Sequence, residues 1–288
     1  MNTQETGKIA VQYLIRAYDN AGQPIVDATT PEMQDVYFNL LRPAKDETVS
    51  LHAIGFELVA VVMSGQCDIT VGETRFEGVG MRGDIWSGMA DSVYAGTGKT
   101  LEVTALGDGV EVAVAGGACN DEFAPFRVRP DEVQSVVVGS SETKSRREIC
   151  HILGQNAADR AGRLLVSELY AEDGCWSGYP PHKHDEERDG ETDHAEIYHY
   201  RYDPETGFGA QFHYFDEGEA DAYMTRHGDT YLLPAGYHPT VTSPGHKGYV
   251  LTILVGRNQR GLVQHFDPTH AHLQAYIPGL GGMRDMFK

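Results

Sequence analysis

The residues best suited to chemistry lie in the second half of the chain, in the segments YPPHKHD, AEIYHY and LPAGYHP. In order, these segments contain His182, His184, Glu196 and His238. Three imidazoles and one carboxylate form a donor set that suits a divalent metal such as zinc, manganese or iron. We therefore predict that these four side chains bind one divalent metal ion.

The spacing of the first two histidines indicates a β-strand. Side chains two residues apart leave the same face of a strand, whereas on a helix they diverge. The pair Pro180–Pro181 directly before them also disfavours a helix. Glu196 is followed at alternate positions by Tyr198 and Tyr200, so it is predicted to face a barrel interior, where an unpaired carboxylate is costly. A bound metal removes that cost.

Short β-rich segments separated by Gly, Asp and Pro dominate the chain. The predicted strands are 56–62, 67–71, 101–105, 110–114, 164–170, 196–202, 209–215, 231–233 and 249–255. The 33 glycines and 13 prolines fit many tight turns, and no segment shows a long helical period. The pattern predicts an all-β fold, either a barrel or a sandwich.

A weak internal repeat predicts two lobes. The segment around Glu57 matches the segment around Glu196, and a Gly-Asp pair opens a similar stretch in each half. Every histidine except His52 falls at or after residue 151, which assigns the metal to the second lobe. We predict an N-terminal lobe without metal ligands at 1–129, a polar connector at 130–147 and a C-terminal metal-binding lobe at 148–288.

Composition limits the partners and the compartment. The net charge of −19 argues against a nucleic-acid surface, which needs a basic footprint. Four well-separated cysteines without a CxxC pair are typical of reduced thiols in a cytoplasm. The N-terminal segment lacks the apolar core of a signal peptide, and no run approaches the roughly 18 apolar residues of a membrane span. A cytoplasmic protein that binds neither nucleic acid nor membrane is expected.

The motifs resemble those of the 5-deoxyglucuronate isomerase family of inositol catabolism, whose members are two-lobed cupins. The resemblance covers most of the chain. The matching segments are WSGYPPHKHD (176–185), EIYHY (196–200), DPETGFGAQ (203–211), LPAGYHP (233–239), DPTH (267–270) and DSVY (91–94). The resemblance implies two cupin-type jelly-roll barrels, a bicupin, with one metal held by His182, His184, Glu196 and His238.

Two departures from general cupins favour this family. Eleven residues separate the second histidine from Glu196, where general cupins have only a few, and Tyr237 alone separates Gly236 from His238. Both features are shared with the resembled family. Cys175 and Gly178 replace an Asn and a Ser of its motif, which leaves the ligands intact.

The resemblance implies a function. Members convert 5-deoxy-D-glucuronate to 5-dehydro-2-deoxy-D-gluconate, an aldose–ketose isomerisation in myo-inositol catabolism, so we expect a uronate substrate and a metal acting as a Lewis acid. Tyr198 and Tyr237 are predicted to transfer the proton, and Gln211 to bind the substrate. Alternation along the strand sends Lys183 to the face opposite its histidine neighbours, which predicts a solvated lysine. Exposed sheet edges predict a homo-oligomer.

Three other functions stay open at this point. The first is a ketol-isomerase acting on 4-deoxy-5-hexosulose uronate, with similar chemistry and metal. The second is an iron-dependent cupin dioxygenase, since sites with three histidines and one glutamate also activate oxygen. The third is a non-catalytic cupin that binds sugars. The YPPHKHD segment and the long gap before Glu196 favour the first-named isomerase over the ketol-isomerase.

Overall fold

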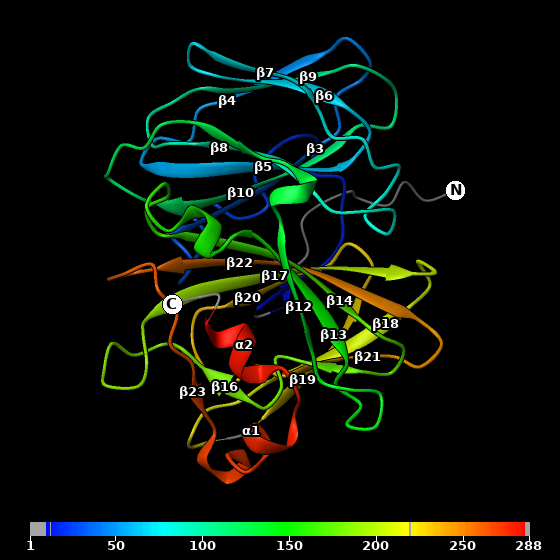
Figure 1. Ribbon diagram of the computed structural model, residues 1–288, viewed down its shortest axis with the longest axis vertical. Coiled ribbons are helices and arrows are strands. Elements are labelled where there is room, and N and C mark those ends of the chain that lie inside the picture. The colour runs from blue at the N-terminus through cyan, green and yellow to red at the C-terminus, as the bar shows by residue number, and fades with distance from the viewer. Residues whose placement is uncertain (1–9, 12, 219, 286–288) are drawn as a thin grey trace.

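Four β-sheet layers are stacked along the long axis of the computed structural model, as Figure 1 shows. The structure describes residues 10–285 except residues 12 and 219. Residues 1–9, part of the segment for which no signal peptide is predicted, lie outside the described residues. The two upper layers form an N-terminal barrel and the two lower layers form a C-terminal barrel.

The N-terminal barrel has a five-stranded and a four-stranded sheet. The first has the order β11-β8-β5-β10-β3 and contains Phe126–Val128, Asp91–Ala95, Phe56–Ser64, Glu111–Ala118 and Val36–Leu41. The second has the order β4-β9-β6-β7 and contains Thr48–Leu51, Leu101–Ala105, Cys67–Val71 and Thr74–Val79. Buried and partly exposed residues alternate along β6 and β9, because only one face of the outer sheet meets the core.

The C-terminal barrel is built from a larger sheet of eight strands, a four-stranded sheet and a short pair. The order of the first is β1-β2-β20-β17-β22-β14-β13-β12, with Ala10–Val11, Leu14–Ile15, Thr230–Leu233, His194–Asp203, Lys247–Gly256, Leu164–Ala171, Arg147–Leu153 and Gln134–Val138. The four-stranded sheet has the order β15-β21-β18-β19, with Trp176–Ser177, Thr240–Thr242, Phe208–His213 and Asp221–Arg226. The pair joins β16 (His182–Lys183) to β23 (His265–Phe266).

The two inner sheets are buried on both faces. One face of each sheet lines the interior of its own barrel, and the other face packs against the other lobe. In β5, Leu58 and Ala60 belong to the core of the N-terminal barrel, whereas Val59 and Val61 belong to a cluster shared with Ile253 of β22. This double burial explains why these strands are nearly continuous apolar runs.

The internal repeat appears as a shared strand order. The antiparallel series β8-β5-β10-β3 corresponds to β20-β17-β22-β14. Glu57, however, points to the junction between the lobes, where its carboxylate accepts hydrogen bonds from the backbone N–H groups of Gly162, Arg163 and Leu164. Glu57 therefore does not repeat the placement of Glu196 inside a barrel.

Each predicted strand overlaps an observed one, and the all-β prediction is confirmed. Two segments lie elsewhere than the predicted lobe division implies. Leu14 of β2 pairs with Tyr231 of β20, so β2 belongs to the sheet of the C-terminal barrel. The predicted connector contains β12, which pairs with β13 along the edge of the same sheet. The lobe boundaries themselves remain a prediction.

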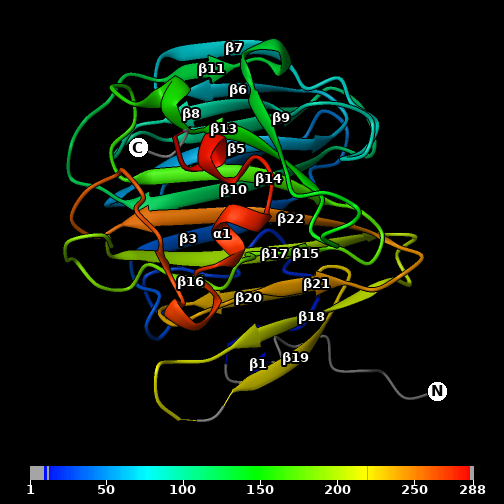
Figure 2. The same cartoon turned by 60° about the horizontal axis from the view of Figure 1, so that its bottom comes forward.

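Helical structure is short and concentrated at the C-terminus. The elements are η1 (Pro130–Glu132), η2 (Gln155–Ala157), η3 (Pro268–His270), α1 (Leu273–Tyr276) and α2 (Leu280–Asp285). In Figure 2 the orange and red C-terminal segment lies over the strands of the C-terminal barrel, close to β16. Among residues 10–285, as far as they are described, no helix is long and apolar enough to cross a membrane.

Candidate metal centre and active site

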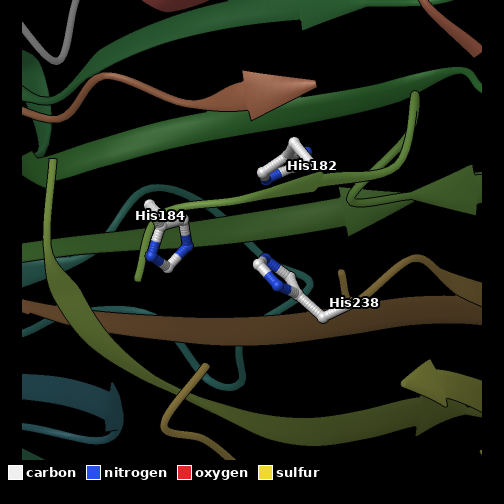
Figure 3. Close-up of side chains that lie close together, drawn as sticks. All are labelled: His182, His184 and His238. Carbon is white, nitrogen blue, oxygen red and sulfur yellow. The ribbon is translucent and has the colours of Figure 1, made fainter. Parts of the chain in front are cut away.

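Three histidines from two separate parts of the chain meet inside the C-terminal barrel. His182 lies on β16, His184 directly follows it, and His238 lies in the turn between β20 and β21. Figure 3 shows the three imidazole rings gathered around one space. All three are buried, and each offers one ring nitrogen that lies within 4.8 Å of those of the other two. This group could bind a metal ion.

Glu196, on β17, completes the arrangement. Its Oε2 lies 3.1 Å from Nε2 of His184 and 3.2 Å from Nε2 of His238. Burial alone raises the pKa of Glu196, but the adjacent His184 and His238 rings outweigh burial and lower that pKa to about 2. The site therefore holds an ionised carboxylate beside the imidazoles.

The orientation of each ring is fixed by a backbone carbonyl that accepts a hydrogen bond from Nδ1. The pairs are His182 with Pro180 (3.0 Å), His184 with His194 (3.1 Å) and His238 with Gly236 (2.8 Å). A carbonyl oxygen can only accept, so Nδ1 carries a proton, and in the neutral form of the ring Nε2 presents a lone pair. Carbonyl partners of this kind orient the histidine ligands of metal sites.

The donor set fits a divalent cation. The Nε2 atom of His238 is buried and has no hydrogen-bond partner among the described residues, although it faces Glu196. A divalent cation at this point would satisfy the nitrogen and compensate the adjacent carboxylate. At His182, Nε2 accepts a hydrogen bond of 2.9 Å from the Gln264 amide, which occupies the same lone pair.

A second set of contacts ties the loop of His238 to the strand of His182. Lys183 donates to Asp185 (2.6 Å), and Asp185 accepts from the backbone N–H of Gly236 (2.6 Å). Gly236 has φ +87°, and a Cβ there would lie 2.8 Å from Nε2 of His213. Glycine at this position therefore lets the turn present His238 to the site.

The prediction for Lys183 is wrong. The side chain is buried, and its Nζ contacts carboxylates of Asp185, Glu186 and Glu191 at 2.6, 2.8 and 3.4 Å. Strand alternation does turn Lys183 away from the histidines, but into an acidic loop instead of solvent. Three carboxylates compensate the buried ammonium, so Lys183 has no capacity left for a substrate.

The eleven-residue excursion between His184 and Glu196 is a compact loop. His194 N–H donates to the carbonyl of His184 at 2.8 Å, which brings the two ends of the loop together. Within the loop, the buried Glu191 accepts from the backbone N–H groups of Asp185 and Glu186. The long insertion therefore leaves Glu196 beside the histidine pair.

A cavity of about 50 Å³ adjoins the cluster. The lining residues are Arg147, Ile149, Ser167, Leu169, Gly178, Tyr179, His182, His184, Glu196, Tyr198, Thr252, Leu254, Leu262, Gln264, Leu280 and Met283. Small-molecule pockets usually measure ~300 Å³ or more, so this cavity is small for a substrate. Its lining includes Leu262, Leu280 and Met283 from the C-terminal segment.

Of the two tyrosines predicted to transfer a proton, the structure brings only Tyr198 to the cavity. Its ring centroid lies 6.0 Å from that of His238, and burial together with the Glu196 carboxylate raises the pKa of Tyr198 well above its usual value. The hydroxyl of Tyr237 instead donates to Asp216 at 2.9 Å, and its ring stacks on Tyr214. Tyr237 does not line the cavity.

Gln211, predicted to bind substrate, is also outside the cavity lining. Its Nε2 donates to the carbonyls of His238 (2.9 Å) and Phe212 (2.8 Å), and its Oε1 accepts from Tyr200 (2.5 Å). With its polar atoms committed, Gln211 holds the backbone of His238 in place.

The cavity also contains polar residues that the sequence reasoning missed, namely Arg147, Ser167, Thr252 and Gln264. Ser167 and Thr252 are paired across β14 and β22, and Thr252 is paired with Tyr198 across β22 and β17. Alternation along 147–153 could have identified Arg147 as inward-facing, but the neighbouring polar stretch suggested a connector.

Sequence comparison relates nearly the whole chain to one family. The profile of the KduI/IolB family matches residues 13–273. A 5-deoxy-glucuronate isomerase of Geobacillus kaustophilus is 33% identical over 84% of this chain and 87% of the relative. A second, from Geobacillus thermodenitrificans, is 31% identical over 85% of this chain and 90% of the relative.

Structural comparison gives the same family and a wider fold class. A crystal structure of an IolB-like protein from Salmonella typhimurium LT2 superposes with a TM-score of 0.85 at 27% identity, covering 92% of this chain and all (100%) of that protein. Oxalate decarboxylase of Bacillus subtilis superposes with a TM-score of 0.57 at 14% identity, over 88% of this chain and 78% of the decarboxylase. The second likeness shows the shared cupin fold alone.

Proposed function

This chain belongs to the KduI/IolB family, and from that membership we propose that it is a 5-deoxyglucuronate isomerase. The reaction is the aldose–ketose isomerisation of 5-deoxy-D-glucuronate to 5-dehydro-2-deoxy-D-gluconate. The curated relatives at 31% and 33% identity carry this name, and they cover most of the chain. A place in inositol catabolism is consistent with the family.

The observation that carries the proposal is a buried cluster of three carbonyl-oriented histidines beside a cavity, two of which contact the buried carboxylate of Glu196. We propose that His182, His184, Glu196 and His238 hold one divalent cation, either zinc, manganese or iron. When bound, the cation would polarise the substrate carbonyl as a Lewis acid. Three neutral imidazoles and one carboxylate leave such a site with net positive charge.

The residues of the chain supply the rest of the chemistry. Isomerisation removes a proton from C2, the carbon next to the aldehyde. A proton is then returned to C1, the former aldehyde carbon. Tyr198 is the proposed group that moves a proton, because its side chain lines the cavity next to Glu196. The apolar wall formed by Leu254, Leu262 and Met283 excludes water from that transfer.

Replacing one ligand tests the metal proposal. We expect His184→Ala to lose both the bound metal, measured by elemental analysis of the purified protein, and turnover in a coupled assay with 5-deoxyglucuronate. The matched control is His272→Ala, which removes an exposed histidine far from the cluster in sequence and should keep the metal and the activity. Full activity of protein stripped of metal would refute the proposed role.

Substrate assays separate this function from its competitors. We expect turnover of 5-deoxyglucuronate to exceed that of 4-deoxy-5-hexosulose uronate, and no oxygen consumption by iron-loaded protein. The reverse preference, or uptake of oxygen, would replace the proposed activity. No turnover of any uronate by fully metallated protein would leave a sugar-binding role.

Two further expectations belong with this function. We propose a cytoplasmic location, and self-association of the chain. The β18–β19 region exposes Phe208, Phe215 and Met224, which would suit contact with a second copy. Analytical ultracentrifugation would detect that association.

A further inference from the structure

Arg147 is a buried arginine without an acidic partner. It is 3% exposed, and among the described residues no carboxylate lies within ion-pairing distance of its guanidinium. The other buried arginine, Arg82, is 4% exposed and pairs with both oxygens of Glu168, at 2.6 and 3.1 Å. A buried charge is normally compensated by an ion pair, as in Arg82, because an unpaired buried charge is strongly destabilising.

The guanidinium of Arg147 is held in place but not fully satisfied. Nη1 donates to the carbonyl of Ser145 and Nη2 to the carbonyl of Tyr179, each at 2.8 Å. Nε is buried and has no hydrogen-bond partner among the described residues. Two neutral carbonyls fix the orientation of the group, yet leave its charge uncompensated and its Nε–H without an acceptor.

The position of Arg147 connects it to the proposed active site. Arg147 begins β13 and lines the same cavity as His182, His184 and Glu196. It is the only lysine or arginine in that lining. Burial lowers the pKa of Arg147 to about 10, which leaves the guanidinium cationic near neutral pH. A cavity that receives an acid therefore contains one oriented cation that no protein group neutralises.

We propose that Arg147 binds the carboxylate of the uronate substrate while the carbonyl end of the same molecule meets the histidine cluster. This inference rests on the proposed function. A guanidinium presents its N–H groups in a planar fork that matches a carboxylate, and charge-assisted bonds of this kind are strong in a site shielded from water. The carboxylate also supplies the counter-charge that Arg147 lacks.

Three variants test the proposal in the full-length, metal-loaded protein. Arg147→Gln removes the charge, and Arg147→Lys keeps the charge but loses the fork. Arg146→Gln is the matched control, since the adjacent Arg146 is half exposed and pairs with Glu172 at the surface. Each variant is assayed with 5-deoxyglucuronate, and its binding of D-glucuronate and D-glucose is measured by isothermal titration calorimetry.

The expected result is a selective loss of acid recognition. Removing a charged hydrogen-bonding partner should lower kcat/KM for Arg147→Gln by roughly 10- to 100-fold, mainly through KM. The kcat/KM of Arg147→Lys should fall between those of the wild type and Arg147→Gln. The kcat/KM of Arg146→Gln should match that of the wild type. The wild type should bind D-glucuronate more tightly than D-glucose, and Arg147→Gln should lose that preference at unchanged metal content.

Each contrary outcome has a distinct meaning. An unchanged KM in Arg147→Gln, or a wild type that binds glucose as well as glucuronate, would overturn the role of Arg147. A glucuronate preference that depends on Arg147, in a protein that does not turn over 5-deoxyglucuronate, would support the carboxylate contact and reject the proposed function. If Arg147→Gln does not fold, the KM and the glucuronate preference of Arg147→Lys decide the question.

Discussion

The backbone decides which nitrogen each histidine of the cluster presents. The Nδ1 atoms of the three rings donate to the carbonyls of Pro180, His194 and Gly236, so Nε2 of His184 and His238 faces Glu196, and Nε2 of His182 faces Gln264. These carbonyls belong to the backbone, so no residue type in the sequence reveals them. The residue types of the cluster were predictable from the sequence, whereas the tautomers depend on how the loops fold.

Tyr198 and Tyr237 offer a matched pair of substitutions. We expect Tyr198→Phe to lower kcat by roughly 10²- to 10⁴-fold, the usual contribution of a proton-transferring group, with the metal content unchanged. Tyr237→Phe should keep kcat close to the wild-type value, because its hydroxyl donates to Asp216 away from the cavity. The measurement is steady-state kinetics on both variants with metal analysis.

An equal loss of kcat in the two variants would contradict this assignment. The sequence alone favoured neither tyrosine, since both stand close to a predicted ligand. Their difference comes from the fold, since the Tyr198 side chain lines the cavity and the Tyr237 hydroxyl donates to Asp216. Lys183 and Arg147 were misjudged for the same reason: the acids near Lys183 and the absence of acids near Arg147 are properties of the folded chain.

Among the elements, the positions of the strands were more predictable than the pairing between them. Alternating or continuous apolar residues revealed the strands that became β5, β14, β17 and β22. Segments with mixed composition, such as β12 and β13, were hidden by polar and charged residues. The pairing of β2 with β20 joins residues more than two hundred positions apart, and no local pattern encodes it.

Helix α2 contributes Leu280 and Met283 to the wall of the small cavity. A helix this short is not stable alone, so its position depends on the packing of these two side chains. A six-carbon acid needs more room than about 50 Å³, so we expect α2 to move during substrate entry.

Deleting residues 280–288 should therefore open the cavity to water. We expect kcat to fall on the order of tenfold, with metal content retained, because the site loses its shielding from water. The control is Tyr276→Ala, which changes an exposed side chain of the preceding helix. Steady-state kinetics and elemental analysis provide the measurement, and wild-type kcat in the truncated chain would show that α2 does not shield the reaction.

At the scale of the whole molecule, a buried ion pair joins the two lobes. Arg82 of the N-terminal barrel pairs with Glu168 of β14, and Glu168 also accepts from the hydroxyls of Tyr170 and Tyr249. The sequence predicted two lobes from a weak repeat but gave no sign of this contact, because each partner is an isolated charged residue in its own segment.

Breaking that pair should destabilise the molecule strongly. We expect Arg82→Met to lower the free energy of unfolding by about 3–5 kcal/mol, because Glu168 is left as an uncompensated buried charge. Arg75→Met, which breaks an exposed pair with Asp68, should lower the free energy of unfolding far less, because water screens that pair. Urea denaturation of both variants measures the difference, and equal effects would mean that the lobes do not depend on the Arg82–Glu168 contact.

The segment before His182 positions both Arg147 and the His182 ring. The carbonyl of Tyr179 accepts from Arg147, and the carbonyl of the next residue, Pro180, accepts from His182. Consecutive carbonyls of one proline-stiffened segment thus set both ends of the proposed substrate path. Because one segment positions both Arg147 and the His182 ring, we expect the protein to prefer acids of one carbon-chain length.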